Sequence, residues 1–342
     1  MNDFHEQNFN NMNGQYPIGG WYDNSNYARQ SYEWGQRRKI KKLSISTGLC
    51  MIAFVFIQVV LLVFINLLNL NSYYEENTLF KNALDILMEV FCIFIPFFIA
   101  ALLSNRENKH SIFNFETPRS VKLFISAIFS GFMICMAANI ISGYFQVFLE
   151  QFGLNGEVPS FPTPTGAPAI LLYIVSISIT PALVEEFAFR GVVMQPLRKF
   201  GDKFAIIISG LVFALLHGNA TQTFFAFNVG TTIGYFVVAT GSIWTGVAIH
   251  FANNFFSVII NILNARNEAL ATDVYQKVMT LAFIIGIIAF VLFALDKNRV
   301  RLATPDMGLT GEQKVASYIF TVPMVAAIVL FLSSIVNMLL RF

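Results

Sequence analysis

Charged residues are scarce in this chain of 342 residues, where they make up only 12% of the total. A soluble globular protein carries roughly 25%, so the composition excludes an ordinary water-soluble fold. The formal net charge is only +2, which provides no extended basic surface, and we expect no nucleic-acid partner. The alternating pattern of a membrane β-barrel is also missing from the sequence.

Cysteine is rare as well. Cys50, Cys92 and Cys135 are the three cysteines, and each lies in an apolar stretch without CxxC spacing. This placement favours packing residues over a disulfide or a metal site. A cleavable signal peptide is not visible, because the N-terminus is polar and the first apolar run begins only near Leu43.

Long apolar runs are what the sequence has in abundance. Hydrophobic residues make up 56% of the chain, its mean hydropathy is +0.61, and a bilayer span needs about 20 such residues. We therefore predict an all-α, polytopic transmembrane bundle with eight or nine spans around an intramembrane cavity. The spans that we count cover residues 43–70, 83–104, 120–149, 168–197, 204–222, 224–240, 242–263, 278–295 and 316–340.

Residues 1–42 are predicted to form a disordered polar tail that precedes a transmembrane domain at 43–342. Residues 1–36 are rich in Asn, Gln, Tyr and Gly and cannot bury enough apolar surface to fold. The tail ends in a basic cluster at 37–42.

The loops fall into two classes that alternate with the predicted spans. The segments 71–82, 150–168 and 264–277 contain few or no basic residues, whereas lysine and arginine gather at 37–42, 105–122, 198–203 and 297–301. By the positive-inside rule, we expect a multi-pass cell-membrane protein, surrounded by lipid, with a cytoplasmic N-terminus and an external C-terminus. Heavy use of Phe, Ile and Asn suggests a bacterial source.

The stretch "PALVEEFAFRGVV", residues 181–193, places three charges within a predicted span. Such charges are costly in a bilayer and usually face an interior cavity that serves a function. Glu186 and Arg190 are four residues apart, so they share a helix face and can form an ion pair. Glu185 is rotated by about 100° and stays free for chemistry. A buried ion pair that only fixes helix packing is the alternative at this point.

Two further motifs place polar residues inside spans. In "FALLHG", 213–218, Phe213 and His217 are four apart, so that the aromatic ring can pack against the imidazole. In "HFANN", 250–254, His250 and Asn254 share one face, while Asn253 points elsewhere and is expected to pack or to bond a neighbouring helix.

The polar residues of these motifs lie at similar depth. Glu185 comes 14 residues before Lys199, His217 comes 13 after Phe204, and Asn254 comes 12 after Ser242, which is roughly 20 Å of helix in each case. We therefore predict one intramembrane site. A carboxylate with two imidazoles and a carboxamide is suited to activating water and stabilising an oxyanion, as in the hydrolysis of an amide bond.

Together, "EEFAFR" (185–190), "FALLH" (213–217) and "HFANN" (250–254) resemble the EExxxR, FxxxH and HxxxN motifs of the CPBP family. That family comprises the CAAX prenyl endopeptidases related to the Ras-converting enzyme, and bacterial relatives that include Abi and bacteriocin-immunity proteins. The resemblance covers about residues 120–295, which we take as the catalytic core.

The resemblance implies a glutamate-dependent intramembrane endopeptidase with no catalytic metal or other cofactor, and a bundle around a cavity open to the cytosol and membrane. It implies that Glu185 is the base that activates water, assisted by His217, and that His250 and Asn254 form the oxyanion hole. The implied supporting residues are Glu186, Arg190 and Phe213. We expect the substrate to be a membrane-associated peptide or protein, with or without a lipid.

Three alternatives fit parts of the pattern. Two histidines and a glutamate are a common zinc ligand set, although the HExxH spacing is missing. A non-catalytic immunity or scaffold protein would keep the family core. A transporter would use Glu185 and the histidines as a proton relay. Outside the motifs, Asp85 and Glu89 lie four apart near the outer end of the second span, and we interpret them as an interfacial feature.

Overall fold

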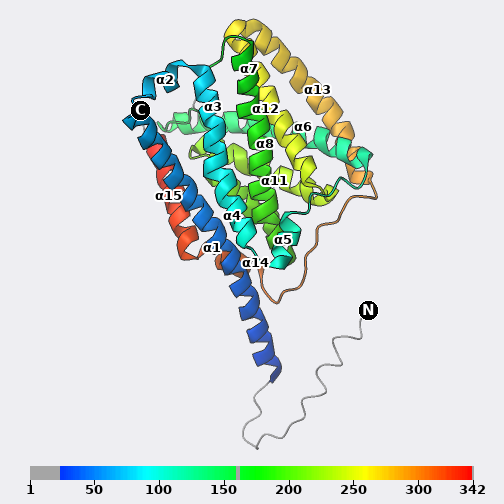
Figure 1. Ribbon diagram of the computed structural model, residues 1–342. Coiled ribbons are helices and arrows are strands. Elements are labelled where there is room, and N and C mark those ends of the chain that lie inside the picture. Colours follow the sequence, from blue (N-terminus) through cyan, green and yellow to red (C-terminus); the bar gives the residue numbers. More distant parts are fainter. Residues whose placement is uncertain (1–23, 159–161, 341–342) are drawn as a thin grey trace, which may run out of the picture.

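The computed structural model describes residues 24–158 and 162–340, and within these ranges every regular element is a helix (Figure 1). The first half contains α1 (Asn24–Leu67), α2 (Asn71–Glu76), α3 (Thr78–Glu89), η1 (Val90–Phe94), α4 (Ile95–Leu103), α5 (Arg106–Ile112), α6 (Val121–Gln151), α7 (Ala167–Ile174) and η2 (Val175–Ile179). The second half contains α8 (Thr180–Glu185), η3 (Glu186–Met194), α9 (Gln195–Leu197), η4 (Arg198–Phe200), α10 (Asp202–Leu215), α11 (Ala220–Thr240), α12 (Ile243–Arg266), α13 (Glu268–Leu295), α14 (Gly311–Ile319) and α15 (Val322–Leu339).

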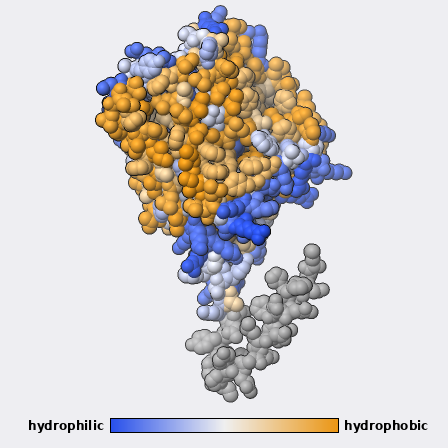
Figure 2. Space-filling model, in the orientation of Figure 1, coloured by the Kyte–Doolittle hydropathy of each residue, from blue (hydrophilic) through white to orange (hydrophobic). Residues whose placement is uncertain are grey.

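Eight helices in the described part of the chain are long and apolar enough to cross a membrane. The predicted class, a polytopic helical bundle, is confirmed. Apolar side chains cover most of the visible face of the bundle, while polar residues gather at the end from which α1 extends (Figure 2). Such an apolar belt with polar ends is what a lipid environment requires.

The predicted span at 204–222 is shorter in the structure. Its helix, α10, has 14 residues and is therefore about 21 Å long, less than the roughly 30 Å of a bilayer core. Gly218 adopts a positive φ of 64°, and the Asn219 side chain caps α11 by accepting a hydrogen bond from the Gln222 amide. Helices α10 and α11 thus form a hairpin whose tip carries His217.

The predicted disordered tail also differs, because α1 already begins at Asn24. Once a membrane span has nucleated a helix, adding residues to it costs little. Contacts hold the extension: Arg29 pairs with Glu33 at 3.1 Å, and the Tyr32 hydroxyl reaches the Met307 sulfur at 3.8 Å. Residues 1–23 of the predicted tail lie outside the described residues.

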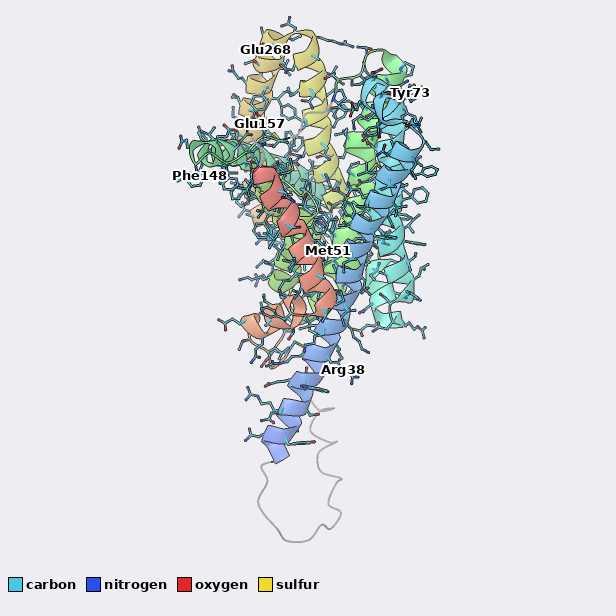
Figure 3. The ribbon with its side chains drawn as sticks, turned by 90° about the vertical axis from the view of Figure 1, so that its left-hand side faces the viewer. Arg38, Met51, Tyr73, Phe148, Glu157 and Glu268 are labelled. Carbon is cyan, nitrogen blue, oxygen red and sulfur yellow. The ribbon has the colours of Figure 1, made fainter. Side chains whose placement is uncertain are left out.

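The predicted loop at 264–277 is mostly helical. Asn267 is the only residue between α12 and α13, and its side chain caps α13 by accepting a hydrogen bond from the Leu270 amide at 3.0 Å. This helix pair reaches the end of the bundle opposite Arg38, where Figure 3 shows Glu268. The end of α15 lies beside the segment that follows α6, because the Asn155 amide donates to the Leu339 carbonyl at 2.9 Å.

Three π-helical segments interrupt the long helices, and each ends two residues before a proline. Segments η1, η2 and η3 precede Pro96, Pro181 and Pro196. A proline inside a helix offers no N–H and its ring clashes with the carbonyl four residues earlier, and the wider π-turn relieves that crowding. Glu185 ends α8 and Glu186 begins η3, so the paired glutamates lie at a change of helical pitch.

Helices α1 and α15 approach closely at Gly48. A Cβ built there would lie 2.6 Å from the Met324 amide nitrogen and 2.6 Å from the Pro323 carbonyl carbon. We expect Gly48→Ala to separate the two helices and to destabilise the purified protein by about 1–3 kcal/mol, as overpacking does. The measurement is thermal unfolding in detergent.

Gly35→Ala is the matched control on the same helix, because nothing lies within 4 Å of a Cβ at that position. It should be neutral or stabilising by up to about 1 kcal/mol, since alanine favours helix over glycine. Equal effects of the two substitutions would contradict the close packing of α1 on α15.

Candidate active site

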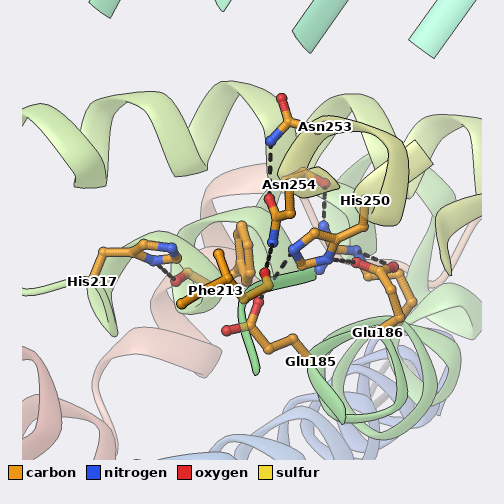
Figure 4. A network of polar contacts seen from close by, with 10 residues as sticks. Glu185, Glu186, Phe213, His217, His250, Asn253 and Asn254 are labelled. Atoms are coloured by element: carbon orange, nitrogen blue, oxygen red, sulfur yellow. Dashed lines mark hydrogen bonds and ion pairs between the residues drawn. The ribbon is translucent and has the colours of Figure 1, made fainter. Parts of the chain in front are cut away.

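One cavity is lined by residues from all three motifs. It has a volume of about 690 Å³, and its walls come from α8, α10, α11, α12 and the segment between α6 and α7. The four predicted catalytic residues line it together: Glu185, His217, His250 and Asn254. Figure 4 shows them grouped around Phe213.

His250 stands between the two glutamates. Its Nδ1 lies 3.0 Å from Glu186 Oε1, and its Nε2 lies 3.6 Å from Glu185 Oε2. The Glu186 side chain is completely buried, whereas 15% of the Glu185 side chain is exposed. The two adjacent carboxylates therefore have different surroundings, and Glu185 is the one that faces the cavity.

Arg190 and Glu186 form the ion pair expected from their spacing. Arg190 Nε lies 3.3 Å from Glu186 Oε2, and both side chains are fully buried. The guanidinium also donates through Nη2 to the Gly230 carbonyl at 3.1 Å and lies 4.8 Å from the centre of the Phe213 ring. The pair thus ties η3 to α10 and α11 around one buried charge.

Phe213 separates the two imidazoles. Its ring centre lies 5.0 Å from that of His217 and 6.0 Å from that of His250, and its carbonyl contacts His217 Nδ1 at 3.1 Å. Within residues 24–158 and 162–340, no hydrogen bond or ion pair joins His217 to Glu185, so the imidazole nearest that carboxylate belongs to His250. The same ranges contain no group of three His, Cys, Asp or Glu residues that could hold a metal ion.

Asn254 is held by a carbonyl that a proline leaves unpaired. Pro181 has no N–H to offer the Ile177 carbonyl four residues earlier, and Asn254 Nδ2 donates to that carbonyl at 3.0 Å. Asn253 donates to Asn254 Oδ1 at 3.0 Å and accepts from Asn139 of α6 at 3.5 Å. The expected helix-bridging role of Asn253 is therefore present, and it orients the Asn254 carboxamide.

Glu89 lies next to this site. The interpretation of Glu89 as an interfacial residue missed its proximity to Glu185. Asp85 does pair with Lys81 at 2.8 Å and accepts from the Tyr74 hydroxyl at 2.9 Å. Glu89 instead has a buried carboxylate oxygen without a hydrogen-bond partner, and its carboxyl is a close neighbour of the Glu185 carboxyl. Its position within an apolar span was the signal that could have identified it.

Gly246 is a second residue that the motifs did not reveal. A Cβ at this position would lie 2.6 Å from Glu186 Oε2 and 2.7 Å from Val237 Cγ2. The missing side chain lets α12 approach η3 closely enough for His250 to reach Glu186. The only signal in the sequence is that Gly246 precedes His250 by four residues and so shares its helix face.

The cavity extends away from the basic loops, toward the end of the bundle that carries the α12–α13 connection. Its lining continues to Val158 and Thr163 and to Asn264 near the end of α12. Glu186 and Arg190 are fully buried and do not line it.

The sequence of this segment matches the model of a known protein family. The sequence model described as "Type II CAAX prenyl endopeptidase Rce1-like" matches residues 167–256, the segment that contains all three motifs. The family resemblance is thereby confirmed. The Rce1-like segment begins with α7 and ends within α12.

A curated relative points the same way. The chain is 27% identical over 149 residues to "Putative membrane peptidase YdiL" of Bacillus subtilis (strain 168), a match that covers 43% of this chain and 61% of the relative. The chain thus spans about three fifths of that relative's length. No solved structure matches the chain at a comparable level of significance.

The buried ion pair leads to a stability prediction. Arg190→Met should destabilise the protein by about 3–5 kcal/mol, because it leaves the buried Glu186 charge without its guanidinium partner. The double variant Glu186→Gln/Arg190→Met should recover part of this loss. Thermal unfolding in detergent measures both.

Lys277→Met is the matched control, because Lys277 and Asp273 form an exposed pair with 71% and 50% of their side chains accessible. Lys277→Met should lower the free energy of unfolding by less than about 1 kcal/mol. An Arg190 variant no less stable than the Lys277 variant would contradict a structural role for the buried pair.

Proposed function

We propose that this protein is an intramembrane endopeptidase that hydrolyses a peptide bond of a membrane-associated protein or peptide, with Glu185 activating the water. The observation that carries the proposal is the unequal placement of the paired glutamates: Arg190 and His250 hold Glu186, while Glu185 faces the cavity. The Rce1-like match and the name of the curated relative support the same reaction class.

In the proposed reaction, Glu185 takes a proton from a water molecule in the cavity. The resulting hydroxide forms a bond to the carbonyl carbon of the peptide, and the carbonyl oxygen becomes an oxyanion. When the C–N bond breaks, Glu185 returns its proton to the amine that leaves. A carboxylate within hydrogen-bond reach of both water and leaving group performs these two transfers in turn.

His250 and Asn254 are the proposed oxyanion donors. Glu186 accepts a hydrogen bond from His250 Nδ1 at 3.0 Å, which directs Nε2 toward Glu185 and the cavity. In the proposed reaction the ring is doubly protonated, so that Nε2 also donates. Asn254 uses one amide hydrogen on the Ile177 carbonyl, and an amide group has a second one to donate. Donors oriented in advance stabilise a developing negative charge without further rearrangement.

His217 and Glu89 act on the two remaining sides in this proposal. His217 is oriented through Nδ1 by the Phe213 carbonyl, so Nε2 is left for the water or the departing amine. The Glu89 carboxyl is a close neighbour of the Glu185 carboxyl, and one of its oxygens is buried without a hydrogen-bond partner. We assign Glu89 the role of a positioning residue that holds Glu185 in its reactive orientation.

Glu185→Gln in purified protein reconstituted into liposomes tests the proposal. It should lower cleavage of added membrane peptides by about 10²- to 10⁴-fold, the usual loss when a general base is removed. Peptide products are measured by mass spectrometry against wild type and against Glu150→Gln, an exposed glutamate of α6. A cellular phenotype that persists in Glu185→Gln would instead favour the non-catalytic immunity or scaffold alternative.

Glu89→Gln should lower kcat by about tenfold with little change in KM, because it replaces the carboxyl beside the reactive Glu185 by an amide, and a loss of about 1.4 kcal/mol in transition-state stabilisation is tenfold in rate. Asp85→Asn, one helical turn earlier and bonded to Lys81, is the matched control and should retain wild-type kcat. A Glu89→Gln enzyme with the kcat of the wild type, or one in which only KM rises, would contradict the positioning role.

A further inference from the structure

Helix α12 carries a polar stripe that continues well beyond the catalytic motif. Successive members are separated by four, three, four and three residues, the spacing that keeps side chains on one helix face. All of them line the cavity that contains Glu185. We call this stripe the asparagine track, and its members are His250, Asn254, Ser257, Asn261 and Asn264.

The track runs from the catalytic residues toward the end of the bundle opposite the basic loops. Helix α12 starts beside the loop before α6, where Ser242 donates to the Glu116 carbonyl at 2.7 Å. Asn264 lies 14 residues beyond His250, which is about 21 Å along the helix. Thr163, from the segment between α6 and α7, lines the same cavity.

The chemistry of the lining favours a peptide backbone. A carboxamide offers both hydrogen-bond donors and acceptors, which match the N–H and C=O groups that alternate along an extended chain. Among the described residues, the cavity lining contains no lysine or arginine, the residues that a phosphate-bearing lipid headgroup would need. Its volume of about 690 Å³ lies within the range of sites that enclose a ligand.

We propose that the asparagine track binds an extended, unlipidated peptide segment and leads it to Glu185 from the end of the bundle opposite the Arg37–Lys42 cluster. Under the positive-inside rule this end faces the exterior, so the substrate is an externally exposed polypeptide. The cleavage step rests on the proposed function, whereas the direction of access is independent of it.

Cysteine accessibility in oriented membrane vesicles tests the direction of access without any assay of activity. Asn261→Cys and Asn264→Cys should react with a membrane-impermeant maleimide in right-side-out vesicles and not in sealed inside-out vesicles. Lys203→Cys, at an exposed position within the basic segment 198–203, is the matched control and should show the reverse. The three native cysteines are all buried, so labelling of the unsubstituted protein measures the background reaction with the maleimide.

Labelling of Asn261→Cys and Asn264→Cys from the same face as Lys203→Cys would overturn the proposed direction. The absence of labelling from both faces would overturn it too, because the track would then be closed to water. Ser257→Cys, one turn nearer Glu185, extends the measurement into the cavity.

The substrate class is tested with a defined mixture of short unlipidated peptides added to vesicles of each orientation. Cleavage should occur only in right-side-out vesicles, where the track faces the added peptides. In the double variant Asn261→Leu/Asn264→Leu, KM should rise about thirtyfold with kcat nearly unchanged, because two hydrogen bonds of about 1 kcal/mol each are lost from ground-state binding. Asn261→Gln should retain most of the affinity.

Cleavage only of lipid-bearing peptides, or only in inside-out vesicles, would overturn the substrate half of the inference. If the cysteines are labelled as expected but no peptide is cleaved on either side, the proposed function fails and the access direction stands. Failure of the two proposals is therefore distinguishable.

Discussion

The buried ion pair between Glu186 and Arg190 is the interaction on which the arrangement of the cavity depends. Neither side chain reaches solvent, so each charge needs the other to offset the cost of burial. The pair uses its remaining contacts to position neighbours: Glu186 holds His250, and Arg190 holds the Gly230 carbonyl and packs on Phe213. Four segments, η3, α10, α11 and α12, are thereby joined at one point.

In this arrangement the two adjacent glutamates differ in burial and in their partners. Glu186 contacts only buried partners, while Glu185 lines the cavity together with His250 and has Glu89 as a neighbour outside the lining. The division depends on close helix approach as much as on charge, because a side chain at Gly246 would occupy the space beside Glu186. Small residues and buried charges therefore act together in positioning the site.

Prolines shape the site by interrupting the helices that carry it. Each π-helical segment ends just before a proline, and the carbonyl that Pro181 leaves without a partner becomes the anchor for Asn254. The same local irregularity that weakens a helix thus supplies a fixed acceptor inside the bundle, where an unpaired carbonyl would be costly. Irregular backbone in a membrane is tolerated where it faces a cavity, as it does here.

The sequence by itself determined the helical membrane class, the approximate spans and the residues that gather at the cavity, because apolar run length and four-residue spacing are local properties. It could not reveal that His250 lies nearer Glu185 than His217 does, that Glu89 joins Glu185, or that α10 is too short to cross the bilayer. Those features depend on contacts between helices far apart in the chain and on π-turns that change the angle between successive side chains. The direction in which the cavity opens was likewise decided by tertiary structure, since only the packing of α6, α8, α11 and α12 determines where a polar stripe meets open space.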